Sequence, residues 1–468
     1  MYRIVIQSVV VIAITIFAKA TFAANSAKPN FILIMADDLG YETIGANGGE
    51  SYQTPYLDKL AAGGIRFDRC NVQPLCTPTR VQLMTGMYNL RNYIEFGRMT
   101  PNAITFGNLL KDAGYATGIA GKWQLGTDEK LPQKFGFDES CLWQHTRRPP
   151  RFANPGLEYN GEERDFHNGE YGPKLVNDFA LDFIERHKDE AFFLYYPMIL
   201  THAPYQPTPD SADWDPKAQG VDSHKNPKYF KDMVAYMDKM VGNVVSKLDE
   251  LKLRDNTIVI FLGDNGTGRG MRSQFKGGTY IGGKGLTNAR GMHVPLIVNC
   301  PGRVQAGQVN DDLIDSTDFL PTMCEAAGAE IPNSLSIDGQ SFWPQLKGEK
   351  GTPREWIYTW YAQAGGPEAK FEFAANKTMK VYRNGRVFDL IKDPFEEHPL
   401  QISELTGAKA EAAAELKAVI AQYEHDRPVE IANAASGVSN KERVKNRPAK
   451  AKKAGRQGRK RKRAAAAE

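Results

Sequence analysis

Polar side chains follow two long apolar runs of the sequence, and their types could bind a metal ion. The run 30–36 ends at Asp37-Asp38, and the run 257–262 leads through a glycine to Asp264-Asn265. Continuous apolar runs are typical of strands buried on both faces of a largely parallel sheet. Open α/β sheets bind ligands at the carboxyl ends of their strands, so we expect these four residues to form a metal site. Their hard oxygen donors suit Ca²⁺ or Mg²⁺ and disfavour zinc.

A cysteine and a histidine are the candidate reactive groups. Cys76 begins a predicted helix in which Pro78 suits the first turn and Gly86 marks the end. Free N–H groups and the helix dipole at such an N-terminus favour an anion, although the cysteine could also be a structural cap. His202 follows an apolar run and is the candidate general acid, because histidine can give up a proton near neutral pH. The alternative is a histidine that is hydrogen-bonded near a strand end.

The elements that must position these groups alternate between strands and helices. Apolar runs predict strands over residues 30–36, 115–120, 191–196, 257–262 and 293–298. Periodicity and stop signals predict helices over residues 54–63, 76–86, 105–113, 177–187 and 227–253. This alternation predicts an α/β fold with a large, mostly parallel or mixed central sheet flanked by helices. The segment 138–171, rich in Pro, Arg and Gly, is expected to be irregular.

The pattern changes from about Gly351. Short antiparallel strands are predicted over residues 356–361, 377–382 and 386–390, followed by a helix over 408–423. Asn384-Gly385 is a predicted hairpin turn between the last two strands. The predicted organisation is a signal peptide at 1–23, a catalytic domain at 24–350, a C-terminal antiparallel subdomain at 351–430 and a disordered basic tail at 431–468.

The N-terminal segment predicts export. Arg3 precedes an apolar run from Val5 to Phe17, and small-residue cleavage patterns end at Ala20 and Ala23. The run is shorter than the roughly twenty residues that a membrane span needs, so a cleaved signal peptide is favoured over a membrane anchor. We therefore expect a periplasmic or secreted protein without a transmembrane segment. Disulfides are allowed in such a compartment, but the pairing of the five cysteines cannot be deduced.

Composition agrees with a soluble globular enzyme. The chain has 468 residues, of which 41% are hydrophobic. Most of the excess positive charge in the net value of +4 lies in residues 441–468, which show no apolar periodicity. Such a basic tail could match nucleic acid, but an exported protein makes a nucleic-acid partner improbable.

The motifs taken together resemble those of the type I sulfatases, the formylglycine-dependent, arylsulfatase-like family of the alkaline-phosphatase superfamily. The pattern C-x-P-x-R occurs as Cys76-Thr77-Pro78-Thr79-Arg80. Its companions are Asp37-Asp38, Gly121-Lys122-Trp123, Thr201-His202-Ala203-Pro204 and Gly263-Asp264-Asn265-Gly266. The resemblance runs from about Asn30 to about Leu400. It implies an alkaline-phosphatase-like fold with a small C-terminal subdomain.

The resemblance implies hydrolysis of a sulfate ester. A formylglycine-generating enzyme would oxidise Cys76 after synthesis, and the hydrate of the resulting aldehyde would be the nucleophile. One Ca²⁺ would be held by Asp37, Asp38, Asp264, Asn265 and the modified Cys76, and it would polarise the sulfate and hold the nucleophile. The substrate implied by the family and by export is a sulfated carbohydrate.

The resemblance also implies roles for several cations. Arg80, one helical turn after Cys76, would pair with the formylglycine hydrate or with the metal ligands. Lys122 would contact the sulfate. The second lysine of the site is assigned to Lys284, which lies ten residues before Val294, the spacing that the family shows. Lys276 is the alternative.

One position departs from the family pattern. Many sulfatases read G-K-W-H-L-G, whereas this chain carries Gln124 in place of the histidine. Glutamine can hydrogen-bond the same group but cannot act as a base near pH 7. Gln124 is therefore interpreted as an orienting residue, and the acceptor of the proton in the second half of the reaction stays open.

Substrate choice is expected to come from the irregular segment. Its aromatic and cationic residues are Trp143, His145, Arg147, Arg148 and Arg151. Rings stack on sugars, and arginines bind sulfate or carboxylate groups, although the segment could equally be a solvated loop. Two other functions stay open: a phosphoester or phosphonate hydrolase on the same fold, and a non-catalytic protein that binds sulfated glycans.

Overall fold

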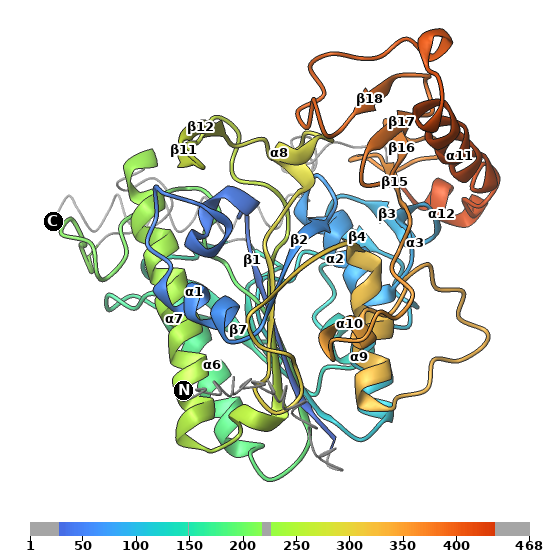
Figure 1. Cartoon of the computed structure of the whole chain (residues 1–468). Coiled ribbons are helices and arrows are strands. Elements are labelled where there is room, and N and C mark those ends of the chain that lie inside the picture. Colours follow the sequence, from blue (N-terminus) through green and yellow to red (C-terminus); the bar gives the residue numbers. More distant parts are fainter. Residues whose placement is uncertain (1–27, 148, 218–225, 436–468) are drawn as a thin grey trace, which may run out of the picture.

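The computed structural model describes residues 28–147, 149–217 and 226–435 (Figure 1). The predicted signal peptide, Arg148 and most of the predicted basic tail lie outside the described residues. None of the helices in the described ranges combines the length and the apolar character that a membrane span requires.

A ten-stranded mixed sheet forms the centre of the molecule. Its order is β14-β2-β13-β10-β1-β9-β5-β6-β7-β8. In chain order the strands are β1 (Asn30–Ala36), β2 (Ile65–Asn71), β5 (Ala116–Gly121), β6 (Glu139–Trp143), β7 (Gly156–Tyr159), β8 (Glu162–Asp165), β9 (Phe192–Pro197), β10 (Thr257–Gly263), β13 (Leu296–Asn299) and β14 (Gln308–Asp315). The central strands β10, β1, β9, β5 and β6 are parallel, and antiparallel pairings lie toward both edges. The predicted large mixed sheet is confirmed.

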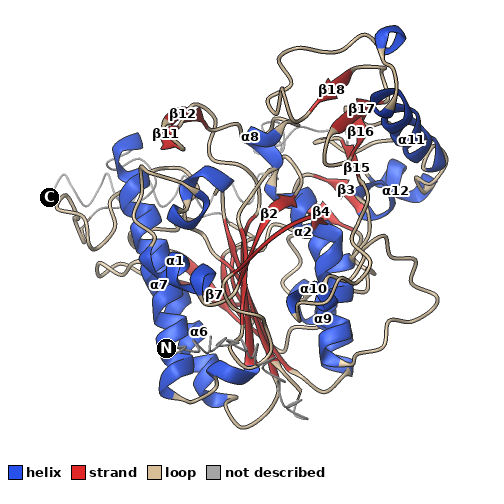
Figure 2. Ribbon diagram, in the orientation of Figure 1, coloured by secondary structure: helices blue, strands red, loops and turns tan. Residues whose placement is uncertain are grey.

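Helices cover both faces of this sheet (Figure 2). One layer contains α1 (Pro55–Ala62), α6 (Gly172–Arg186) and α7 (Phe230–Glu250), and the other contains α2 (Cys76–Thr85), α4 (Phe106–Asp112), α9 (Phe319–Ala327) and α10 (Trp343–Leu346). The shorter helices are α3 (Asn89–Asn92), α5 (Leu131–Lys134) and α8 (Ala289–Met292). Two small hairpins complete this part of the chain: β3 (Tyr93–Glu95) with β4 (Arg98–Met99), and β11 (Arg272–Phe275) with β12 (Gly278–Ile281).

The apolar run of β1 is continuous because each of its faces packs against a different helical layer. Phe31, Leu33 and Met35 belong to the core under α2, α4 and α9. Ile32 and Ile34 belong to the core under α1, α6 and α7. Successive strand residues point to opposite faces, so residues 31–36, which are covered on both faces, are all apolar.

The prediction that residues 138–171 are irregular is wrong in part. This segment contributes β6, β7 and β8 to one edge of the central sheet. The turn between β7 and β8 is Asn160-Gly161, with φ values of 51° and 91°. Two adjacent positive φ values are typical of the tight hairpin turn that Asn-Gly favours, so this dipeptide was the missed signal. The strands are short, with four or five residues each, which hid their alternation.

The C-terminal part forms a separate small antiparallel sheet (Figure 1). Its four strands are β15 (Ile357–Tyr361), β16 (Phe371–Ala375), β17 (Met379–Tyr382) and β18 (Val387–Asp389), and α11 (Ala408–Gln422) packs on them. The predicted hairpin at Asn384-Gly385 is confirmed, since the Gly385 N–H donates to the Tyr382 carbonyl at 2.9 Å. Three strands were predicted and β16 was missed. Helix α12 (Val429–Ala434) continues past residue 430, where the tail was predicted to begin.

All five cysteines, Cys70, Cys76, Cys141, Cys300 and Cys324, are buried and free. The stability of the fold therefore depends on packing and on buried polar contacts.

A buried arginine joins the segment before β15 to the helical layer of the central sheet. The Arg354 guanidinium pairs with Asp318, to which its Nε donates at 3.1 Å, and it donates to the Tyr88 hydroxyl at 2.9 Å. We predict that Arg354→Ala lowers the free energy of unfolding by about 3–5 kcal/mol, because it leaves the Asp318 carboxylate buried and unpaired. Arg186 also makes two ion pairs but is 42% exposed, so Arg186→Ala should cost no more than about 1 kcal/mol. Urea unfolding measures both. Equal losses would contradict this role of Arg354.

Candidate active site

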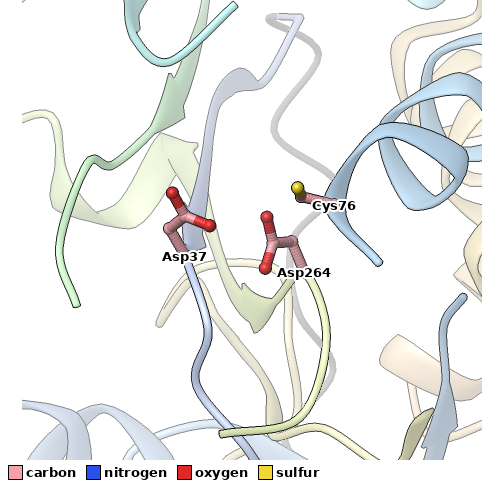
Figure 3. A group of neighbouring side chains, drawn as sticks. All are labelled: Asp37, Cys76 and Asp264. Carbon is pink, nitrogen blue, oxygen red and sulfur yellow. The ribbon is translucent and has the colours of Figure 1, made fainter. Parts of the chain in front are cut away.

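The register of the two central strands brings two carboxylates together. Ala36 at the end of β1 pairs in parallel with Gly263 at the end of β10. Asp37 directly follows β1 and Asp264 directly follows β10, so their side chains meet at the carboxyl edge of the sheet (Figure 3). Both are fully buried. The backbone N–H of Asp38 donates to Asp264 Oδ1 at 3.0 Å and joins the two strand ends.

Helix α2 presents Cys76 to these carboxylates (Figure 3). The Cys76 Sγ and one oxygen each of Asp37 and Asp264 lie within 4.8 Å of one another. Cys76 is 1% exposed, and burial raises the pKa of its thiol. One turn later, the Arg80 guanidinium donates to Asp264 Oδ2 at 3.0 Å and to the Lys122 carbonyl at 2.9 Å. Arg80 therefore contacts Asp264, one of the predicted metal ligands.

Two lysines complete the cationic side of the cluster. Lys122, just after β5, donates from Nζ to both Asp37 oxygens at 2.8 and 2.7 Å. Lys284 Nζ lies 2.5 Å from Asp38 Oδ1. Lys276 instead sits in the turn between β11 and β12, with its ammonium 5.2 Å from the centre of the Phe275 ring. The structure therefore brings Lys284, and not Lys276, into the site.

The cations divide the carboxylates into two kinds. Burial alone would raise the pKa of Asp37, but Lys122 and the other nearby cations hold it well below its usual value. The pKa of Asp38 is also lowered, since His202 and Lys284 outweigh its burial. The pKa of Asp264 is raised to about 7 by burial and by the charge of Asp37, despite its contact with Arg80. The ionised form of Asp264 is therefore poorly stabilised in the metal-free protein, and a bound metal cation would stabilise it.

The donor set fits a divalent cation. Asn265 is fully buried, and its Nδ2 donates to Asp38 Oδ1 at 2.9 Å. Its Oδ1 has no hydrogen-bond partner, although a buried amide oxygen normally has one. Carboxylate and amide oxygens are the ligands that Ca²⁺ and Mg²⁺ prefer, so a cation among Asp37, Asp38, Asp264 and Asn265 would satisfy the unpaired oxygen.

His202 reaches the same centre from the loop after β9. Its Nε2 lies 3.8 Å from Asp38 Oδ2. The loop is held by the strand end, because Thr201 N–H donates to the Asp37 carbonyl at 2.7 Å. Burial and the neighbouring Arg151 and Lys284 lower the pKa of His202 to about 4, although the two aspartates act in the opposite direction. Without a bound anion, the imidazole is therefore neutral at pH 7.

Gln124 lies beside the cluster in a restricted conformation. Its φ of 61° is in the left-handed region, which non-glycine residues rarely adopt. Its side-chain Oε1 is buried and without a hydrogen-bond partner, and its carbonyl lies 3.5 Å from the Thr77 hydroxyl. The strained backbone is consistent with a side chain that is held in place at a functional site.

A cavity of about 260 Å³ opens next to His202 and Lys122. Three residues of the predicted substrate cluster line it, and these are Trp143, His145 and Arg151. Arg147 does not line it, because its guanidinium pairs with Glu163 and Asp165, each at 2.7 Å. The cluster is therefore divided between a cavity wall and an outer edge of the sheet, and Arg148 lies outside the described residues.

One positioning residue was not predicted from the sequence. Thr79 is fully buried, and its hydroxyl donates to the Asp264 carbonyl at 2.6 Å, which joins α2 to the end of β10. It occupies the variable position of C-x-P-x-R, so the motif itself carried no signal for it.

A mixed central sheet with a buried cluster of paired carboxylates and cations at its carboxyl edge defines an alkaline-phosphatase-like fold. The family model described as Sulfatase matches residues 29–329, and a model described as N-sulphoglucosamine sulphohydrolase, C-terminal, matches residues 283–425. The chain belongs to the type I sulfatase family, and it is a sulfatase.

Similar curated proteins include two sulfatases with different printed activities. Arylsulfatase A of Homo sapiens is 30% identical over 467 residues, which cover 86% of this chain and 89% of that protein. N-acetylgalactosamine-6-sulfatase of Canis lupus familiaris is 32% identical over 372 residues, which cover 72% of this chain and 69% of that protein.

Solved structures agree with the fold. The crystal structure of Ps i-CgsB superposes with a TM-score of 0.74 at 26% identity, covering 86% of this chain and 94% of that chain. The phosphonate monoester hydrolase SpPMH from Silicibacter pomeroyi superposes with a TM-score of 0.62 at 16% identity, covering 86% and 96%. The second likeness shows a shared fold alone.

We predict that CaCl₂ raises the melting temperature of the wild-type protein, because an ion that binds only the folded state stabilises it. Asp264→Ala should abolish this shift, since it removes one of few hard ligands. Asp178, 48% exposed and paired with Lys174, provides a control, and Asp178→Ala should keep the shift. A full shift in Asp264→Ala, measured by scanning calorimetry, would show that the metal ligands are assigned wrongly.

The raised pKa of Asp264, about 7, predicts that protons compete with the metal. Below this pH the carboxyl is protonated in the metal-free protein, so binding of Ca²⁺ must release the proton. We expect the affinity for Ca²⁺ to fall by about tenfold per pH unit below pH 7 and to level off above it. Isothermal titration calorimetry in buffers of different ionisation enthalpy measures both the affinity and the released proton. An affinity that is constant from about pH 5 to pH 8 would exclude the competition.

Proposed function

We propose that this protein is an exported, calcium-dependent sulfatase that releases sulfate from a sulfated carbohydrate and uses a formylglycine formed from Cys76. One observation carries the proposal. The Cys76 Sγ lies within 4.8 Å of the carboxylate oxygens of Asp37 and Asp264, at the N-terminus of α2. The proposed nucleophile, the proposed metal ligands and a helix N-terminus of the kind that favours anions would thus lie together at one buried point.

The chain's own cations would neutralise the sulfate. Lys122 and Lys284 already pair with Asp37 and Asp38, so metal binding to these carboxylates would leave both ammonium groups available to sulfate oxygens. Arg80 would stay with Asp264 and hold its carboxylate in place. Formylglycine would supply a geminal-diol nucleophile, and the cation would supply Lewis-acid polarisation of the ester.

His202 would protonate the leaving alcohol from Nε2. Its pKa of about 4 is unsuited to this task in the absence of an anion. A sulfate ester bound between Lys284 and the helix end brings negative charge close to the imidazole and favours its charged form. The Ala203 carbonyl, 2.5 Å from Nδ1, would accept a hydrogen bond from the Nδ1–H of that imidazolium and fix the ring.

The carbohydrate substrate is supported by relatives and by the cavity. N-acetylgalactosamine-6-sulfatase, 32% identical, carries a sulfated sugar in its name. Ps i-CgsB, 26% identical, was also solved in complex with k-i-k-neocarrahexaose. Trp143, with one ring face covered by Arg151, adds an aromatic side chain to the cavity wall, and aromatic side chains are common in sugar-binding sites.

Export and maturation belong to the same proposal. The apolar run after Arg3 and the small residues before Ala23 support a signal peptide, which would deliver the protein to the periplasm or outside the cell. A formylglycine-generating enzyme would be its partner during maturation. We expect no nucleic-acid partner.

Two features bear on the alternative functions, which are phosphoester or phosphonate hydrolysis and glycan binding without catalysis. The likeness to a phosphonate monoester hydrolase concerns the fold, and a sequence identity of 16% gives no information about the substrate. Gln124 stands where many sulfatases have a histidine, which would be compatible with a protein that binds sulfated glycans without turnover. The complete carboxylate set and the intact Cys76 motif favour turnover.

We predict that protein co-expressed with a formylglycine-generating enzyme releases sulfate from at least one member of a panel of defined sulfated oligosaccharides. Cys76→Ala should fold normally, because the small thiol contributes little core, but lose at least about 10³-fold in kcat, since the nucleophile is gone. Ion chromatography of released sulfate is the measurement, and mass spectrometry verifies conversion of Cys76.

Matched phosphate and phosphonate esters are assayed in parallel at equal concentration. A higher kcat/KM for the phosphate or phosphonate esters than for the sulfate esters would identify hydrolysis of phosphorus esters as the main activity. Binding of sulfated oligosaccharides without any release by the converted protein would indicate a non-catalytic binder. Retained activity in Cys76→Ala would exclude the formylglycine mechanism.

A further inference from the structure

We propose that the cavity beside His202 binds the sugar that carries the scissile sulfate, and that Arg151 in its wall selects sugars with a second anionic substituent, either a carboxylate or another sulfate. This inference rests on the proposed sulfatase activity and deepens it by naming the substrate class.

The cavity adjoins the reacting centre on the side of the leaving group. Lys122 and His202 belong to its lining, and these same residues contact Asp37 and Asp38 of the metal site. A sulfate placed among them would therefore point its sugar into this cavity. The volume of about 260 Å³ lies just below the roughly 300 Å³ lower limit of drug-sized sites, which suits one sugar residue.

Arg151 is held rigidly in the cavity wall. Its guanidinium lies over the Trp143 ring, 4.7 Å from the ring centre. Its Nη2 donates to the Ala203 carbonyl at 2.6 Å and lies 3.0 Å from His202 Nδ1. The indole is fixed in turn, because Trp143 Nε1 donates to the Pro149 carbonyl at 3.0 Å. A planar cation fixed in this way loses little conformational entropy when it binds an anion.

The charge of the cavity wall favours a second anion. None of the described residues that line the cavity is acidic, whereas Lys122 and Arg151 are cationic. The Glu158 carboxylate does not line the cavity, and its Oε2 lies 3.0 Å from Nδ1 of the lining residue His145. Lys122, which pairs with Asp37 in the metal-free protein, would contact the scissile sulfate, so Arg151 is the group that would meet a second substituent on the sugar. A charge-assisted contact in such a partly desolvated site is stronger than one in water.

The contact of Arg151 with His202 allows a different role. Arg151 could serve only to orient the imidazole, in which case its loss would slow all sulfate esters by the same factor. A role in recognition instead predicts a loss that depends on the second anion. The ratio of kcat/KM between sugars with and without a second anion therefore distinguishes an orienting role of Arg151 from a role in recognition.

The test compares three esters with the converted protein: a hexosamine 6-sulfate, the same hexosamine with a second sulfate, and a sulfated hexuronic acid. We expect kcat/KM for at least one of the two dianionic sugars to exceed that for the monosulfated sugar by about tenfold or more. Arg151→Gln should bring this ratio close to one, mainly by raising KM for the dianionic sugar. Arg147→Gln is the matched control, since Arg147 does not line the cavity, and it should keep the wild-type ratio.

A second readout does not need turnover. Calorimetric titration of Cys76→Ala protein with the same sugars should show tighter binding of the dianionic sugar by about tenfold, and this preference should vanish in the Cys76→Ala, Arg151→Gln double variant. Equal affinity for mono- and dianionic sugars, or an unchanged selectivity ratio in Arg151→Gln, would overturn the inference. Sulfate release without any such preference would leave the sulfatase activity standing. A preference in binding without release by the converted protein would overturn the activity instead.

Discussion

The structure depends on a buried group of opposite charges at the carboxyl edge of the central sheet. Ion pairs without solvent are costly unless each partner is matched, and here the aspartates are matched by Lys122, Lys284 and Arg80. The match is incomplete at Asp264, whose pKa is raised, and at the unpaired Asn265 oxygen. A divalent cation would neutralise the Asp264 carboxylate and coordinate the Asn265 oxygen. The same buried charges that limit the stability of the metal-free protein would therefore favour metal binding.

The surrounding elements are arranged around this group. Parallel pairing of β1 with β10 sets two carboxylates side by side, and α2 aims the cysteine at them. The hydroxyl of Thr79 and the guanidinium of Arg80 reach from that helix to Asp264 and fix the distance between helix and sheet. A buried contact of this kind allows little adjustment, because close-packed interiors resist displacement. The packing of α2 against the central sheet therefore also fixes the relative positions of Cys76 and the two carboxylates.

The proposed selectivity for the sugar lies on a less constrained part of the molecule. The antiparallel edge formed by β6, β7 and β8 supplies Trp143 and the loop that carries Arg151. Edge segments tolerate change in sequence better than the parallel centre, since fewer layers pack on them. The contact of Arg151 with His202 joins the two regions, so Arg151 lies beside the group that we propose as the general acid.

The sequence by itself determined the alternation of strands and helices, the carboxylates at two strand ends and the helix that begins at Cys76, because each follows from local patterns of apolarity, capping and glycine. The family resemblance added the choice of Lys284 over Lys276. Only the tertiary structure decided that Arg151 faces the site whereas Arg147 pairs outward, and that the Asn265 oxygen is left unpaired. Contacts between segments far apart in the chain leave no local pattern, since they depend on sheet order and register.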